Sequence, residues 1–342
     1  MRRSIRGLVV SVAAVVVLGA LCEPLEGQTR RRSRRAAGKP AQVPLDPARV
    51  NDAAVSSVPI SRGSSGGAVL RAQVLLDRAR FSPGEIDAAF GGNTVKAVAG
   101  FQKARGLEPT GSIDDATWKA LNADTAPAVA RYTIQPPDVA GPFLEVPEEM
   151  MEKATLPALG YSSPLEAISE KFHTSPKLVT RLNPGKALNS GDEIVVPNVA
   201  APKPRKAAKI VVDASDLTVS TFDAEDKPIA QYPATTGSEH DPLPIGSWKV
   251  NGVSRNPPFH YNPDLFWDAE ATDEKTTIKP GPNNPVGVVW IDLSKPHYGI
   301  HGTPEPSTIG KTQSHGCIRL TNWDAAELAD MVGPGTPAIL QE

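Results

Sequence analysis

Cysteine is nearly absent from this chain of 342 residues, which contains only Cys22 and Cys317. Cys22 lies in or beside an apolar N-terminal segment, so an exported mature form would hold one unpaired thiol. A single thiol excludes a disulfide framework and suits a nucleophile in an oxidising compartment. The chain also lacks the clustered spacings of structural zinc sites, although His297, His301 and His315 are ligand types near Cys317. We therefore expect no metal.

Long apolar runs and a charge bias are missing as well. Beyond residues 8–21, no apolar run approaches the roughly 20 residues that cross a bilayer, so we expect the remainder to be soluble outside the cytoplasm. The formal net charge of -2 gives no general attraction to nucleic acid, and no such partner is expected. The length and the 34 prolines favour several domains joined by linkers.

The N-terminus has the pattern of a secretory signal, which we predict over residues 1–27. Three early arginines precede the apolar run 8–21, which is too short for a membrane span. A lipid anchor at Cys22 is the less favoured alternative, because Leu21 occupies the place where a lipoprotein cleavage site has a small residue. We expect an exported protein of the periplasm or cell wall, with membrane contact only through this segment.

Composition divides the first half of the remaining chain. Residues 28–65 are predicted to form a disordered basic tether, because an arginine-rich run is followed by Pro, Ala, Ser and Gly without periodicity. Apolar residues then recur at near-helical spacing over residues 66–122. Residues 123–157 are rich in Pro, Ala and Glu and are predicted to contain a linker. A second short module is predicted over residues 158–199, with a helix starting at Pro176 and a strand near its end.

After a basic, proline-rich linker at 200–208, strand signals dominate residues 209–342. Four β-branched or aromatic runs are bounded by turn residues: 210–212, 217–222, 248–250 and 286–291. A helix is expected to start at residues 321–324 and to stop at residues 333–335. We therefore predict a multidomain α+β protein with a small helical module, a short α/β module and a mostly β C-terminal domain.

The heptapeptide SHGCIRL places Cys317 beside histidine, glycine and arginine. A thiol reacts as its thiolate, which neighbouring cations favour, and a histidine can also take the proton. Gly316 lets backbone amides approach the sulfur, where they could stabilise an oxyanion. A second histidine, His301, stands upstream. Because both histidine motifs accompany it, Cys317 is a candidate nucleophile rather than a small buried core residue.

The segments IHGTPEPSTIG and SHGCIRL resemble the signature of YkuD-type L,D-transpeptidase catalytic domains of the bacterial cell envelope. The resemblance extends over about residues 210–341. It implies acyl transfer through a thioester on Cys317, without metal or cofactor. The acyl donor would be a tetrapeptide stem of peptidoglycan, which loses its terminal D-amino acid. The acceptor would be an amine, usually on a neighbouring stem.

By this resemblance His301 is the base, and the backbone carbonyl of Gly302 orients it. His315 is either an alternative base or a residue that shapes the site. The backbone amides of His315, Gly316 and Cys317 are available for the oxyanion.

Three further residues are candidates for substrate binding. Arg319 could hold a carboxylate bidentately, the alternative being a structural ion pair. Ser314 is expected to position the loop by hydrogen bonding. Tyr298 is a candidate for lining the cleft, with a core or turn role as the alternative.

Two upstream resemblances suggest partners. Residues 66–122 resemble a PG-binding-1 peptidoglycan-binding module, with Ala88 where glycine is usual, although a helical bundle without a ligand is the alternative. Residues 158–199 are similar to LysM modules, which bind glycans containing N-acetylglucosamine, but lack the usual Gly-Asp-Thr before the first helix.

The expected partners are therefore peptidoglycan stem peptides and glycan strands, with an envelope lipoprotein as a possible acceptor. Three alternatives to crosslinking remain open: an L,D-carboxypeptidase, a lipoprotein-to-peptidoglycan ligase and a non-catalytic wall-binding scaffold. If the upstream modules are simple tethers, a fragment beginning near Lys206 should keep its activity on soluble substrates.

Overall fold

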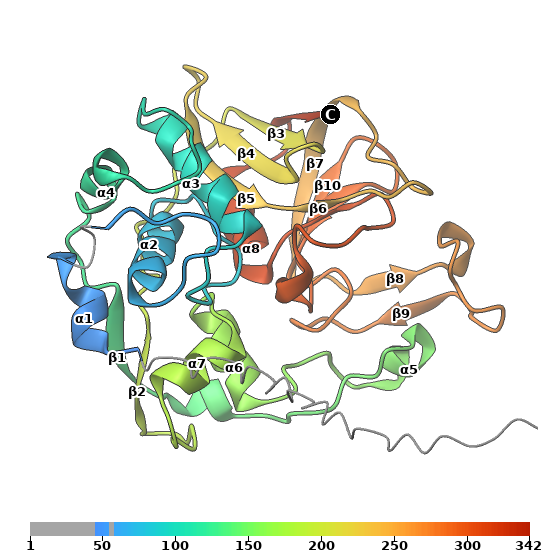
Figure 1. Cartoon of the computed structure of the whole chain (residues 1–342). Coiled ribbons are helices and arrows are strands. Elements are labelled where there is room, and N and C mark those ends of the chain that lie inside the picture. Colours follow the sequence, from blue (N-terminus) through green and yellow to red (C-terminus); the bar gives the residue numbers. More distant parts are fainter. Residues whose placement is uncertain (1–44, 55–57) are drawn as a thin grey trace, which may run out of the picture. The chain divides into compact units, whose positions relative to one another are not determined.

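The computed structural model describes residues 45–54 and 58–342 (Figure 1). The predicted signal segment, the arginine-rich run and Cys22 lie outside these residues. The described residues belong to one compact unit. Within the described part, no helix has the length and apolar character needed to cross a membrane. Part of the stretch predicted as a tether forms α1 (Pro47–Asn51), because Asp46 accepts a hydrogen bond from the backbone N–H of Ala48 and Val50 is buried.

The helical module consists of α2 (Gly67–Arg78), α3 (Gly92–Ala104) and α4 (Asp115–Leu121). Their apolar faces share one core, in which Phe101 and Trp118 are almost fully buried. The turn after α2 places Ala88 at a φ of 62°, in the left-handed region that favours glycine. This agrees with glycine being usual at that position in the resembled modules.

The second module pairs two strands around two helices. Strand β1 (Val129–Thr133) runs antiparallel to β2 (Glu193–Pro197), with α6 (Pro164–Lys171) and α7 (Pro176–Leu182) between them in sequence. Strand β1 lies inside the stretch predicted to contain a linker, because five residues between proline-rich segments carry little periodicity. The insertion after β1 contains η2 (Pro136–Val139) and α5 (Met150–Thr155).

The C-terminal domain is built on a nine-stranded sheet with the order β5-β4-β3-β13-β7-β10-β11-β12-β6. In chain order its strands are β3 (Lys209–Asp213), β4 (Thr218–Phe222), β5 (Pro228–Pro233), β6 (Thr235–Thr236), β7 (Gly246–Arg255), β10 (Val289–Leu293), β11 (Gly299–His301), β12 (Ile318–Arg319) and β13 (Pro337–Gln341). A separate hairpin joins β8 (Phe259–Tyr261) to β9 (Thr276–Ile278), with η3 (Pro263–Leu265) in its loop. The segment 306–308 forms η4 (Pro306–Thr308).

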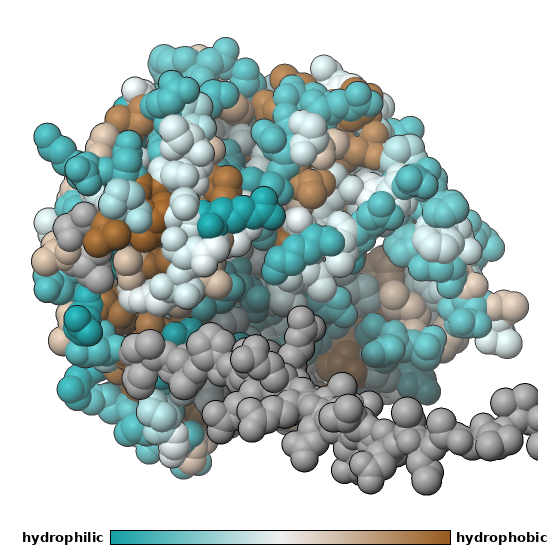
Figure 2. Space-filling view, in the orientation of Figure 1, coloured by the Kyte–Doolittle hydropathy of each residue, from teal (hydrophilic) through white to brown (hydrophobic). Residues whose placement is uncertain are grey.

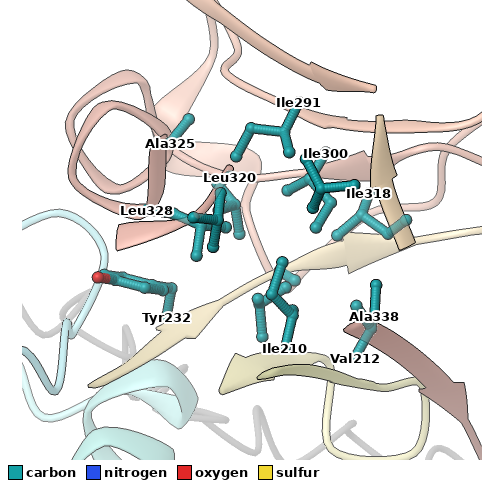
Figure 3. Close-up of a cluster of buried hydrophobic side chains, with 14 of the residues drawn as sticks. Ile210, Val212, Tyr232, Ile291, Ile300, Ile318, Leu320, Ala325, Leu328 and Ala338 are labelled. Atoms are coloured by element: carbon teal, nitrogen blue, oxygen red, sulfur yellow. The ribbon is translucent and has the colours of Figure 1, made fainter. Parts of the chain in front are cut away.

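Helix α8 (Asn322–Met331) packs on this sheet and completes its core (Figure 3). Thr321 caps the helix by accepting a hydrogen bond from the backbone N–H of Asp324 at 3.2 Å. Leu328 of α8 and Ile291 and Ile300 of the sheet belong to the same buried cluster. Both β11 and β12 contribute residues to this core. The residue after β11 and the residue before β12 therefore have fixed positions.

The edge strand β5 is covered by the helical module. The backbone of Gln231 accepts a hydrogen bond from the N–H of Ser82 and donates one to the carbonyl of Arg80, each at 2.8 Å. Pairing of this kind removes an exposed strand edge. On the face in Figure 2, apolar residues form separate patches among hydrophilic ones. Among the described residues, the large apolar side chains that are exposed include Ile245, Leu265 and Trp267.

Candidate active site

Cys317 lies immediately before β12, at the end of the loop that follows η4. Strand β12 pairs in parallel with β11, which sets Ile318 opposite Ile300. The Sγ atom lies 3.6 Å from the carbonyl oxygen of His297. Burial raises the pKa of Cys317 to about 11, and the backbone of Gly299 and the charge of Arg319 only partly oppose it. The sequence led us to expect that nearby cations would favour the thiolate, but burial is the larger effect.

His301 is the last residue of β11 and is buried, with 5% of its surface exposed. Its Nδ1 lies 2.7 Å from the carbonyl oxygen of Gly302. Since a carbonyl can only accept, Nδ1 donates and Nε2 is left with a lone pair. Burial lowers the pKa of His301 to about 4, and the positive charge of Arg319 adds to the effect. The ring also stacks on Trp290, its cross-strand neighbour, with centroids 5.4 Å apart. His301 is therefore a neutral, fixed imidazole at neutral pH.

His315 is engaged in another direction. Its Nε2 lies 2.8 Å from a carboxylate oxygen of Asp268, in the loop between β8 and β9. Its ring packs edge-on against Phe266, with centroids 5.1 Å apart, and lies 5.8 Å from the ring of Trp267. The structure thus connects His315 to the hairpin loop.

Glycines allow close packing at two points of the site. Gly316 has a φ of 89°, and a Cβ added there would lie 2.8 Å from a ring carbon of Tyr298. A Cβ at Gly302 would lie 2.2 Å from Oδ1 of Asn322. Both glycines are therefore needed for the approach of a neighbouring side chain, and Tyr298 packs directly on the loop that holds Cys317.

Ser314 and Arg319 brace the loop from both sides of Cys317. The Ser314 hydroxyl donates to the carbonyl of Cys317 at 2.7 Å, which agrees with a positioning role. One terminal nitrogen of Arg319 donates to the carbonyl of Gln313, while its Nε is buried without a hydrogen-bond partner in the described part of the chain. Burial lowers the pKa of Arg319. An unpaired buried donor leaves Arg319 able to bind an acceptor.

Family matches agree with this geometry. Residues 207–340 match the L,D-transpeptidase catalytic domain family (YkuD). Residues 65–121 match a peptidoglycan binding domain family. The assigned L,D-transpeptidase YkuD of Bacillus licheniformis is 32% identical over 175 residues, which cover 50% of this chain and 90% of the relative. Its Bacillus subtilis counterpart is 32% identical over 176 residues, with the same shares covered. The chain belongs to the L,D-transpeptidase family.

These matches confirm the predicted catalytic domain and the predicted helical peptidoglycan-binding module of this L,D-transpeptidase, while the LysM-like resemblance stays a prediction. A solved L,D-transpeptidase from Xylanimonas cellulosilytica is 17% identical, with a TM-score of 0.35 over 82% of this chain and 96% of that chain. A similarity at that level has no part in the assignment.

The sequence did not reveal four residues that the L,D-transpeptidase fold brings to the site. Asp241 has a buried carboxylate oxygen without a hydrogen-bond partner in the described residues, and its charge raises the pKa of Cys317. Asp268 holds His315, and Asn322 packs against Gly302. The fourth, Glu170 of α6, accepts a hydrogen bond from Asn322. Polar residues in loops and on helices carry no periodic signal, so none of the four could be singled out.

Proposed function

We propose that this enzyme crosslinks peptidoglycan through a thioester on Cys317. The observation that carries this proposal is the fixed, neutral imidazole of His301 on the strand beside the nucleophile. A base must be unprotonated and correctly aimed. Burial supports the first requirement by lowering the pKa of His301, and the carbonyl of Gly302 supports the second by engaging Nδ1.

In the first step the Cys317 sulfur attacks the carbonyl carbon of the third residue of a tetrapeptide stem. His301 takes the thiol proton as the S–C bond forms. The C–N bond to the terminal D-amino acid then breaks, and His301 returns the proton to the leaving amine. Backbone amides of residues 315–317 are proposed to stabilise the oxyanion between these events.

In the second step an amine attacks the thioester carbon. His301 takes a proton from this amine as the C–N bond of the crosslink forms, the S–C bond breaks, and His301 passes the proton to the sulfur. The amine is proposed to come from a neighbouring stem. Water, or an amine on an envelope lipoprotein, would use the same thioester, so the acceptor distinguishes the transpeptidase from a carboxypeptidase or a lipoprotein ligase.

Arg319 and Tyr298 are proposed to bind the donor stem. The buried, unpaired Nε of Arg319 supports recognition of a substrate oxygen. Tyr298 packs on Gly316 and so borders the reacting sulfur. His315 is proposed to shape the site through Asp268 instead of acting as the base.

The upstream modules are proposed to bind the cell wall of a bacterium that exports this protein. The order β1-α6-α7-β2 with antiparallel strands supports a LysM-like unit, enlarged by the insertion after β1. A cavity of about 500 Å³ lies against this insertion, and Phe143, Tyr161 and Lys171 are among its lining residues. An aromatic ring beside polar groups suits a sugar. Replacing Phe143 by Ala should weaken retention on insoluble sacculi, while the exposed Val58→Ala should leave it unchanged.

The test of the reaction is incubation of the purified protein with disaccharide tetrapeptide. Crosslinked dimer supports the transpeptidase, tripeptide alone supports a carboxypeptidase, and unchanged substrate supports a scaffold. Cys317→Ala should abolish every product while sacculus binding persists. If that variant kept a tenth of the wild-type turnover, the thioester mechanism would have to be abandoned.

A further inference from the structure

Helix α6 of the LysM-like module buries a carboxylate against the start of α8. Glu170 is 8% exposed, and both of its carboxylate oxygens lie 3.1 Å from Nδ2 of Asn322. Asn322 is the first residue of α8 and is itself buried. The hydrogen bond therefore joins an upstream module to the catalytic domain.

The side chain of Asn322 lies between the segment before β10 and the residue after β11. Its Oδ1 accepts from the backbone N–H of Val288 at 3.2 Å, and its Nδ2 also donates to the carbonyl of Pro282 at 3.1 Å. A Cβ added at Gly287 or Gly302 would lie 2.0 Å or 2.2 Å from Oδ1. The amide of Asn322 thus fills the space between these two glycines and fixes their backbone.

Gly302 is the residue whose carbonyl engages Nδ1 of His301. A continuous series of contacts therefore runs from Glu170 through Asn322 and Gly302 to the base. We propose that Glu170 is a positioning residue for His301, so that the LysM-like module forms part of the catalytic apparatus. This inference rests on the proposed role of His301 in acyl transfer.

Burying the Glu170 carboxylate between two modules has a desolvation cost. Burial raises the pKa of Glu170 to about 7; the nearby charge of Glu166 adds to this, while Asn322, Tyr161 and His173 oppose it. An apolar side chain would fill the space without this desolvation cost. What the carboxylate adds is a fixed acceptor for the Asn322 amide, which an apolar side chain lacks.

The experiment compares four full-length proteins: wild type, Glu170→Gln, Glu170→Met and Glu166→Ala. Glu166 is a matched control, because its carboxylate accepts from Nδ2 of Asn283 at 2.8 Å and makes the same kind of bridge without touching Asn322. Single-turnover acylation of Cys317 by a carbapenem gives the rate, and thermal unfolding confirms that each protein is folded.

Glu170→Met keeps the volume but removes the acceptor, so the acylation rate constant should fall about 10–100-fold, the range for a small displacement of a reacting group. The KM for tetrapeptide should change little. Glu170→Gln keeps a carbonyl that can accept from Asn322 and should recover most of the rate. Glu166→Ala should acylate at the wild-type rate. A folded Glu170→Met protein with wild-type acylation, or equal losses in the Glu166 and Glu170 variants, would overturn the proposal.

A second readout does not depend on the reaction. The proton NMR resonance of the His301 Nδ1–H should lie downfield in the wild type and in Glu170→Gln, and should shift or broaden in Glu170→Met. An unchanged resonance in Glu170→Met would overturn the positioning role. Failure of the wild type to acylate at all would instead overturn the proposed function, while the NMR comparison would still decide the role of Glu170.

Discussion

The two side chains proposed to react have pKa values that favour their neutral forms. Burial raises the pKa of the Cys317 thiol to about 11 and lowers the pKa of the His301 imidazole to about 4. A preformed thiolate–imidazolium pair is therefore disfavoured in the free enzyme. In the proposed reaction, proton transfer must therefore accompany attack on the carbonyl, so the orientation of His301 matters more than its basicity.

Alkylation of Cys317 by iodoacetamide should therefore be slow at neutral pH. With a pKa of about 11, roughly one thiol in a thousand is ionised at pH 8, and the rate should rise about tenfold per pH unit up to pH 10. Mass spectrometry of the Cys317 peptide in a Cys22→Ala background gives the rate. Asp241→Asn should speed the reaction at pH 8, because Asp241 raises the thiol pKa, and Arg319→Gln should slow it. A rate that levels off below pH 9 would contradict the effect of burial.

The two histidines should differ in their effect on acylation. His301→Ala should slow acylation by a carbapenem roughly 10²–10⁴-fold, the range for a positioned base. His315→Ala should retain more of this step, because Nε2 of His315 is held by Asp268. Stopped-flow measurement of both variants tests the assignment, with Asp268→Asn as a control for the hairpin contact. A larger defect in His315→Ala would reverse the roles.

The sequence predicted the residues with distinctive chemistry but not those that act through packing. Cys317, His301 and His315 stand in short motifs whose residue types already indicate nucleophile and base. Asn322 and Glu170 are ordinary polar residues of helices, and they are separated by 152 positions. Only the folded chain brings them together, so no local pattern could show their contact.

At the scale of elements, prediction succeeded where β-branched or aromatic residues cluster between turn residues. The runs that form β3, β4, β7 and β10 were recognised by their β-branched residues. The strands that position the site were not, since β11 has three residues and β12 two. Strands this short have no measurable alternation, and they exist because the neighbouring strands supply their hydrogen bonds.

Helix α8 carries a buried carboxylate in its first turn. Burial raises the pKa of Asp324 to about 8, the charge of Asp77 adds to this, and Thr321, His173 and Ser82 oppose it. Ser82 donates to the carboxylate at 3.0 Å. The folded-state pKa lies above the value of about 3.9 in an unfolded chain. Stability from this group is therefore fully present below about pH 4 and is lost as pH rises to 8.

Asp324→Asn should remove this pH dependence. Relative to the wild type, its unfolding temperature should rise progressively between pH 4 and pH 8, because the amide stays neutral. Differential scanning calorimetry at several pH values measures the difference. Asp115→Asn, at an exposed position in the first turn of α4, should show no such trend. An Asp324→Asn protein that lost stability equally at every pH would show that the carboxylate is ionised in the folded state.

At the scale of the whole described chain, both upstream modules make partly buried contacts with the catalytic domain. Arg80 of the helical module forms an ion pair with Glu327 of α8 at 3.1 Å. His173 stacks on Trp323 with centroids 5.3 Å apart and planes 7° from parallel. These polar and aromatic contacts add to the backbone pairing along β5. The sequence suggested separate modules on linkers, because composition marks linkers but does not report which surfaces pack together.

These contacts change what is expected of the fragment beginning at Lys206. As a simple tethered domain it would keep its activity on soluble muropeptides. In this fold it loses the partner of edge strand β5, the ion pair of Glu327 and the contact that holds Asn322. At roughly 0.5–1.5 kcal/mol per hydrogen bond, several such losses should lower the unfolding temperature by about 10 °C or more relative to residues 43–342.

The rate of Cys317 acylation should fall as well, because Glu170 no longer holds the Asn322 side chain that packs against Gly302. Adding residues 43–205 as a separate polypeptide should restore part of the rate. A fragment as stable and as active as residues 43–342 would instead mean that the upstream modules act only as tethers.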